Sequence, residues 1–184
     1  MNHFARRSVS GRSFATLVLF GALLVLGCRD STAAGPAATT ADTAGGAAVG
    51  AQPEFRLKTL DGRVLGPKDF KGKVVVVDFW ATWCGPCQIQ SRILEPLSQD
   101  YKGKKVQFLA ANVGEDERTV KRFLENKPFP YPVLMDPDSA VSNSLGVYAL
   151  PTLIIIDKKG KISFVQPGLT DADTLRQKLK EAGA

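Results

Sequence analysis

Histidine and cysteine are scarce in this chain of 184 residues, which contains one histidine, His3, and three cysteines. Cys84 and Cys87 lie three positions apart, whereas Cys28 and His3 lie far upstream of them. A structural zinc ion usually takes four cysteine or histidine ligands. Because only two such residues are close in sequence, we expect no metal site.

Signals for nucleotides and nucleic acids are also missing. The chain has neither the GxxxxGK[ST] nor the GxGxxG loop that cradles phosphates, and no block of Lys and Arg alternates with aromatic residues. The lysines clustered at positions 102–105 and 158–161 are typical of solvated turns. We therefore expect neither a nucleotide cofactor nor a nucleic-acid partner.

The most informative motif is Trp-Cys-Gly-Pro-Cys at residues 83–87. The apolar run before it predicts a buried strand, and Pro86 suits the first turn of a helix. The helix dipole and the unpaired N–H groups at that point should lower the pKa of the Cys84 thiol. We expect Cys84 to be the exposed nucleophile and Cys87, one turn on, to be the more buried resolving thiol.

A dithiol–disulfide cycle of this pair would need no other cofactor. Gly85 and Pro86 limit how far the two sulfurs can separate, and so they tune the redox potential. Two alternatives remain, a zinc half-site and a static structural disulfide, because CxxC alone is a common pattern. Trp83 beside the pair would by itself also fit an ordinary core residue.

Asp78 interrupts the apolar run at residues 74–80. A carboxylate in a buried strand is unfavourable unless it is paired, protonated or used chemically. The alternative is a charge at the solvated end of a strand. Asp78 is thus a candidate for a role in the chemistry of the cysteines.

Three motifs, at residues 77–81 (Val-Asp-Phe-Trp-Ala), 83–87 and 150–152 (Leu-Pro-Thr), make residues 54–183 resemble the thioredoxin superfamily. The resemblance implies an α/β, thioredoxin-like fold, with a central mixed β-sheet flanked by helices. It also implies a cis Leu150–Pro151 bond that faces the cysteines and presents the Leu150 backbone to an extended substrate. Without the resemblance, Pro151 could simply open a strand.

The resemblance further assigns roles to individual residues. A buried aspartate at the position of Asp78 exchanges a proton with the resolving thiol, and burial raises its pKa. Gly168 matches a family glycine near the cysteines, although a plain loop glycine would look the same. The resulting candidate substrate-binding residues are Trp83, Gly85, Pro86, Leu150, Pro151 and Gly168.

Within the superfamily the chain resembles the membrane-anchored TlpA/ResA type. An N-terminal hairpin at residues 54–65, turning at Asp61-Gly62, and an inserted helix–strand segment between residues 112 and 151 favour this type. Arg92 replaces a usual helix proline, and Pro96 follows four residues later, so we expect a displaced kink. ResA-type proteins often have glutamate inside the cysteine motif, so their substrate specificity does not transfer to this chain.

The remaining pattern predicts an α/β order without internal repeats. We expect the turn between the last two strands at residues 157–160, and Thr170 or Asp171 as the cap of the final helix. Besides the hairpin, the predicted elements are strand 73–80, helix 86–101, strand 105–113, helix 116–126, strand 132–135, helix 138–145, strands 152–157 and 161–166, and helix 171–182.

The N-terminal segment has the features of an export signal. Arginines 6, 7 and 12 precede an apolar stretch at residues 14–27, and no acidic residue occurs before Asp30. That stretch is short for a membrane-spanning helix, which needs about 20 residues. Residues 25–28 resemble a lipobox, which predicts a signal peptide at residues 1–27 and lipidation of Cys28. The alternatives are an uncleaved anchor and a soluble secreted form.

Residues 28–53, rich in Ala, Gly, Ser and Thr, are predicted to be a flexible lipid-anchored linker before a domain at residues 54–184. About 25 such residues have an r.m.s. reach on the order of 25 to 30 Å. A bacterial cell-envelope lipoprotein facing the periplasm or extracytoplasmic space is therefore expected. We also expect it to be a monomer.

The function predicted is a tethered thiol:disulfide oxidoreductase that reduces protein disulfides. Its electrons would come from a membrane thiol transporter, and it would serve cytochrome c maturation or metalloprotein assembly. Alternatives are a disulfide-forming oxidant, a tethered binding module and a thiol peroxidase. The peroxidase pattern usually has proline and threonine where this chain has Val77 and Ala81.

Overall fold

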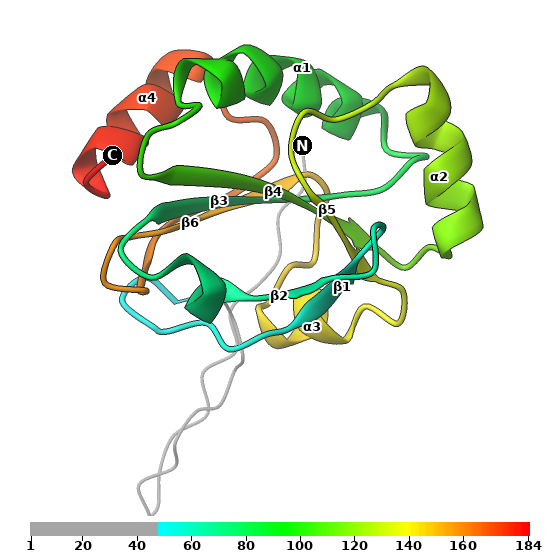
Figure 1. The fold of residues 1–184 in the computed structure, drawn as a ribbon, viewed down its shortest axis with the longest axis horizontal. Helices are drawn as coiled ribbons and strands as arrows, with labels where there is room; N and C mark the ends of the chain where they lie inside the picture. The colour runs from blue at the N-terminus through cyan, green and yellow to red at the C-terminus, as the bar shows by residue number, and fades with distance from the viewer. Residues whose placement is uncertain (1–47) are drawn as a thin grey trace, which may run out of the picture. The chain divides into compact units, whose positions relative to one another are not determined.

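The computed structural model describes residues 48–184, and its central element is a mixed seven-stranded β-sheet in the order β2-β1-β5-β4-β3-β6-β7 (Figure 1). The strands are β1 Leu57–Thr59, β2 Val64–Leu65, β3 Val74–Trp80, β4 Val106–Val113, β5 Val133–Asp136, β6 Thr152–Ile156 and β7 Ile162–Pro167. The helices are η1 Pro67–Phe70, α1 Gly85–Asp100, α2 Glu117–Asn126, α3 Ala140–Ser144 and α4 Ala172–Glu181.

Strand β3 lies inside the sheet, and every one of its side chains is buried. It pairs parallel with β4 and antiparallel with β6. β-Branched residues favour such a strand, and alternate side chains point to opposite faces. Val76 and Trp80 accordingly belong to one core layer, while Val77 and Phe79 belong to the other.

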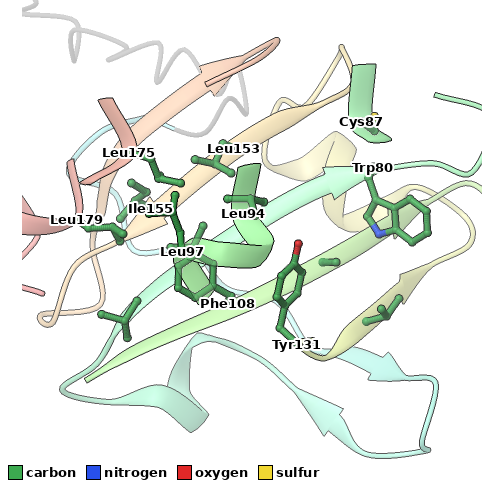
Figure 2. Close-up of a cluster of buried hydrophobic side chains, with 14 of the residues drawn as sticks. Trp80, Cys87, Leu94, Leu97, Phe108, Tyr131, Leu153, Ile155, Leu175 and Leu179 are labelled. Atoms are coloured by element: carbon green, nitrogen blue, oxygen red, sulfur yellow. The ribbon is translucent and has the colours of Figure 1, made fainter. Parts of the chain in front are cut away.

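The first core layer lies under α1, α2 and α4. Leu94 and Leu97 of α1, Leu175 and Leu179 of α4 and Trp80 of β3 all belong to this layer and are labelled in Figure 2. Figure 1 shows α1 and α4 together on this face and α3 on the opposite face. The cysteine motif at the start of α1 therefore lies on the first layer.

The predicted order of elements is confirmed, with boundaries that differ by a few residues. The hairpin turns at Asp61-Gly62 as predicted, since Gly62 N–H donates to the Thr59 carbonyl and Gly62 has φ +88°. Its strands are shorter than the predicted span, and β1 also pairs with β5, which extends the sheet at that side. The short helix η1 was not predicted, although proline at its first position is a typical start signal.

Aspartate side chains cap the N-termini of two helices. Asp171, one of the two predicted caps, accepts hydrogen bonds from the N–H groups of Asp173 and Thr174 at the start of α4. Asp116 does the same for α2. Pro96 lies within α1, as the sequence predicts.

The predicted signal peptide, the lipidation site Cys28 and most of the linker lie outside the described residues. Among residues 48–184, none of the helices has both the length and the apolar character that a membrane crossing requires.

Candidate active site

Cys84 and Cys87 form a disulfide at the N-terminus of α1. Cys84 is the N-cap residue of the helix, and its sulfur accepts a hydrogen bond of 3.2 Å from the Cys87 N–H. Gly85 and Pro86 form the first positions of the helix, where proline needs no hydrogen-bond donor. The bond closes one turn of the helix and places the Cys84 sulfur at the positive end of the helix dipole.

The predicted exposure of Cys84 is wrong for this oxidised form. Cys84 is 4% exposed and Cys87 is 2% exposed, so Cys87 is the more buried of the two as expected, but the difference is small. In the disulfide each sulfur covers part of the other, and both side chains belong to the first core layer. Trp83, by contrast, is 73% exposed, which excludes the alternative that it is a core residue.

The cis peptide bond between Leu150 and Pro151 is confirmed. Phe79 pairs with Thr152 across β3 and β6, so Pro151 lies next to the end of β3 from which the cysteine loop departs. Among the described residues, the backbone N–H and carbonyl of Leu150 have no hydrogen-bond partner. These groups are therefore available to an extended polypeptide beside the disulfide.

Gly168 lies next to Pro151, because its N–H donates a 2.7 Å hydrogen bond to the Pro151 carbonyl. Its φ is +82°, a conformation that favours glycine. No atom lies within 4 Å of the place where a Cβ would stand, so the space in front of it is open. The predicted site residues thus come together from three connections: β3–α1, the segment before β6, and β7–α4.

Large apolar side chains are exposed in the same three connections and in the first turns of α1. Besides Trp83, they are Ile89, Tyr148 and Leu169, which are exposed by 46%, 82% and 47%. Apolar groups exposed around a reactive centre are typical of a surface that binds a partner.

Asp78 is completely buried in β3. By strand alternation its side chain points to the layer of Val76 and Trp80, on which α1 and the cysteines lie. Neither carboxylate oxygen has a hydrogen-bond partner among the described residues. The equally buried Asp136 differs, since its oxygens accept hydrogen bonds from the Val141 and Ser142 N–H groups.

Burial without compensating donors raises the pKa of Asp78 well above its ordinary value. The burial excludes a solvated strand end for Asp78, and the raised pKa means that the folded protein disfavours the ionised form of this carboxyl group. Tyr131, just before β5, also points its hydroxyl into this layer (Figure 2), and burial and the Asp78 charge raise its pKa. The layer behind the disulfide therefore disfavours negative charge.

Glu115, in the loop between β4 and α2, is a site residue that the sequence analysis missed. Its carboxylate accepts hydrogen bonds from the Thr82 N–H at 2.7 Å, the Thr82 hydroxyl at 2.5 Å and the buried Asn112 amide at 2.7 Å. Gln88 of α1 donates to the Thr82 carbonyl at 3.3 Å. The loop before Cys84 is thus held from both sides, by Glu115, which is 33 positions away from Thr82, and by the nearby Gln88.

Replacing Glu115 with alanine is expected to lower the free energy of unfolding of the oxidised protein by about 1.5 to 3 kcal/mol, because three donors lose a charged acceptor. Glu115→Gln keeps one acceptor oxygen and should cost less than half as much. Urea unfolding of both variants measures the difference. Equal stability of all three proteins would show that Glu115 does not hold the loop.

Gln90 is a second residue without a sequence signal. Its buried side chain accepts a 2.7 Å hydrogen bond from the Thr170 N–H and donates a 3.2 Å bond to the Thr170 carbonyl. This pairing ties α1 to the segment that carries Gly168. Only the tertiary structure reveals it, since the two residues are 80 positions apart.

Within residues 48–184, no three histidine, cysteine, aspartate or glutamate side chains are grouped closely enough to hold a metal ion.

A disulfide at a helix N-terminus beside a cis-proline, on a mixed sheet, defines the class of thioredoxin-like oxidoreductases. A profile of the Redoxin family matches residues 47–180. The chain belongs to the Redoxin family, as a ResA-like member of the thioredoxin superfamily.

Individual relatives agree with this class. The thiol-disulfide oxidoreductase ResA of Geobacillus thermodenitrificans is 37% identical over 128 residues, which cover 70% of this chain and 74% of that protein. A Chlorobium tepidum structure, assigned as the thiol:disulfide interchange protein DsbE, has a TM-score of 0.68 and 32% identity, covering 73% of this chain and 97% of that one. The exposed lipoprotein thioredoxin Etrx1 of Streptococcus pneumoniae has a TM-score of 0.63 and 30% identity, covering 69% and 98%. These similarities confirm the thioredoxin-like fold.

Proposed function

We propose that this protein is an exported, membrane-tethered reductase of protein disulfides. The observation that carries the proposal is the Cys84–Cys87 disulfide at the start of α1 next to cis Pro151. In the reduced form, the Cys84 thiolate would attack a substrate disulfide, forming a mixed disulfide and releasing one substrate thiolate. Cys87 would then attack Cys84, releasing the second substrate thiol and restoring the internal disulfide.

Asp78 would serve the second step as a proton acceptor. Cys87 must lose a proton to become a nucleophile, and a carboxyl group with a raised pKa can exchange protons near neutral pH. Asp78 points to the core layer that also contains Cys87, which supports this role. The electrons for the next cycle would come from a membrane thiol transporter.

The substrate would bind as an extended segment along Leu150. Its backbone would pair with the open N–H and carbonyl groups of that residue, as a strand adds to a sheet edge. Trp83, Gly85, Pro86 and Gly168 would line the same surface. Disulfides of apocytochrome c or of metalloprotein assembly factors are the substrates we propose.

The tether rests on the sequence of the first 28 residues together with the relatives. Etrx1 is described as an exposed lipoprotein, and the segment before Cys28 has the charge pattern and length of a lipoprotein signal. We propose that Cys28 is lipidated and that the domain acts at the extracytoplasmic face of a bacterial membrane.

The redox equilibrium of the Cys84/Cys87 couple with glutathione tests the direction of the reaction. A reductase should have a potential near that of thioredoxin, about −270 mV, and should therefore be reduced only by a large excess of reduced glutathione. A potential near −120 mV, as in strong oxidases, would reject the reductase and leave the disulfide-forming oxidant. Rapid oxidation of Cys84 by peroxide would instead support the peroxidase.

A further inference from the structure

Three turns that are distant in sequence meet at the end of the sheet opposite the cysteines. They precede β3, precede β4 and follow β6; β3 and β4 are parallel, and β6 is antiparallel to β3. Figure 1 shows them together at the left, where α4 also ends. Because β3 has seven residues, at about 3.3 Å each, this end lies on the order of 20 Å from the start of the cysteine loop.

Lysines gather in two neighbouring hollows at this end. One hollow is lined by Lys68, Lys71, Lys73, Lys158 and Lys159. The other is lined by Lys73, Lys102, Lys104 and Lys105. Lys73 lines both, so the eight lysines form one continuous surface, which we call the basic end.

Few carboxylates neutralise the basic end. Of the carboxylates within residues 48–184, only Glu54 and Asp157 line either hollow, and Glu54 pairs with Lys68 at 2.8 Å. Asp157 accepts hydrogen bonds from the Lys159 and Lys161 backbone N–H groups. Among the described residues, the other seven lysines have no carboxylate within 4.0 Å.

The charge of the domain is therefore unevenly distributed. Residues 48–184 contain 20 basic and 16 acidic side chains, a net charge of +4. The two hollows alone contain eight lysines and two carboxylates, a net charge of +6. The rest of the domain is net negative. The positive charge is therefore concentrated at the basic end and is not spread evenly over the surface of the domain.

The chain also enters the domain at the basic end. Gly50 N–H donates to the Ile162 carbonyl at 2.7 Å, and Ile162 N–H donates to the Ala51 carbonyl at 2.8 Å, at the start of β7. Gln52 and Pro53 then line the first hollow with the lysines. The segment that connects the domain to residues further upstream therefore leaves from this side.

We propose that the basic end docks on anionic lipid headgroups and so directs the disulfide end away from the membrane. The proposal rests on the membrane tether proposed above, which would bring the entry side of the domain close to the lipid. A flat anionic surface can contact lysines from several turns at once, and each lysine near such a surface strengthens association about fivefold. Loss of three lysines should weaken docking on the order of 100-fold.

Acetylation footprinting of the full chain in vesicles tests this orientation. The protein is reconstituted into phosphatidylcholine vesicles with or without phosphatidylglycerol, and mass spectrometry measures the acetylation rate of each lysine. With phosphatidylglycerol, acetylation of Lys71, Lys102, Lys105 and Lys159 should slow about tenfold or more, whereas Lys127 beside α2 should change little. About 0.5 M salt should remove the protection, because it screens charges beyond a few ångströms.

A charge-matched pair of variants sharpens the test. The triple variant Lys73→Gln, Lys104→Gln, Lys158→Gln should lose the protection of the remaining basic-end lysines. The control variant removes the same charge from α2 by the substitutions Arg118→Gln, Lys121→Gln and Arg122→Gln. In this variant the basic-end lysines should stay protected from acetylation. Both variants should reduce a soluble disulfide substrate at the native rate, because none of the six residues lies at the disulfide.

Three outcomes would overturn the proposal: equal acetylation with and without phosphatidylglycerol, equal protection of Lys127, or equal loss in both triple variants. Stronger protection by polyglutamate than by phosphatidylglycerol at equal charge would also overturn it, in favour of an acidic protein partner. Flotation with pure phosphatidylcholine vesicles reports the tether separately, and disulfide reduction reports the redox function separately. Failure of either is thus distinguishable from failure of lipid docking.

Discussion

Replacing Cys84 with serine is expected to lower the rate of disulfide reduction by at least about 1000-fold, the largest effect of any single substitution in this chain. A serine hydroxyl stays protonated at neutral pH, so the attacking anion that the start of α1 stabilises would be lost. Stopped-flow or insulin-reduction kinetics with the reduced protein measure the rate. A Cys84→Ser variant with more than a tenth of the native rate would contradict the assignment of Cys84 as nucleophile.

Cys87→Ser is the matched variant. It should retain the attack of Cys84 on the substrate disulfide but lose the step in which Cys87 releases the substrate. The mixed disulfide at Cys84 should then persist and can be isolated with its substrate and identified by mass spectrometry. Both variants are made in a Cys28→Ser background, so that no third thiol resolves the intermediate. Recovery of partners by non-covalent binding alone, with no mixed disulfide at Cys84, would favour the tethered binding module.

Replacing Asp78 with asparagine is expected to raise the stability of the oxidised protein at neutral pH while slowing disulfide exchange about 10- to 100-fold. The stability gain arises because the folded state forces this carboxyl group to keep its proton, or to ionise in a buried site, at a cost of roughly 1.4 kcal/mol per unit of raised pKa. The loss of rate arises because asparagine cannot accept the Cys87 proton. Thermal or urea unfolding and exchange kinetics measure the two effects.

The stability difference between Asp78→Asn and the native protein should grow as the pH rises. Below about pH 4 Asp78 is protonated in both folded and unfolded chains, so its ionisation has no effect on stability. As the pH rises above that value, the unfolded state releases the Asp78 proton at a lower pH than the folded state does, so the native protein loses stability relative to Asp78→Asn. The exposed control Asp138→Asn should change the stability at pH 7 by less than about 0.5 kcal/mol, because asparagine can also accept the hydrogen bond from the Ala140 N–H. A stability difference for Asp78→Asn that does not grow between pH 4 and 7 would contradict the raised pKa.

Most elements of the fold could be predicted because their signals are local. The valine run of β3, Pro86 in the first turn of α1 and Asp171 before α4 act through the backbone conformation of a few neighbouring residues. The pairing of β1 with β5 could not be predicted in the same way. It depends on contacts between segments more than 70 positions apart, for which hydrophobic alternation alone specifies no partner.

The residues of the candidate site also fall into two groups, those that local sequence signals indicate and those that only the fold reveals. Cys84, Cys87 and Pro151 could be located from short motifs, and Asp78 from its contrast with an apolar run. Glu115 and Gln90 could not, because an ordinary polar residue in a loop or helix gains its function only from the backbone groups that it meets in space. The low exposure of Cys84 in the disulfide form was also not predicted.

The amino-acid sequence by itself determined the chemistry of this protein: two thiols one helical turn apart, a carboxyl group in a buried strand and a proline beside them. The tertiary structure alone decided how these groups are supported and where the surface charge lies. It brought Glu115 to the loop before the cysteines, left the Asp78 carboxyl group without a hydrogen-bond donor among residues 48–184, and collected lysines from three turns at the opposite end. The reason is physical: reactivity resides in single side chains and their neighbours, whereas hydrogen bonding, desolvation and electrostatic fields depend on groups that only folding brings together.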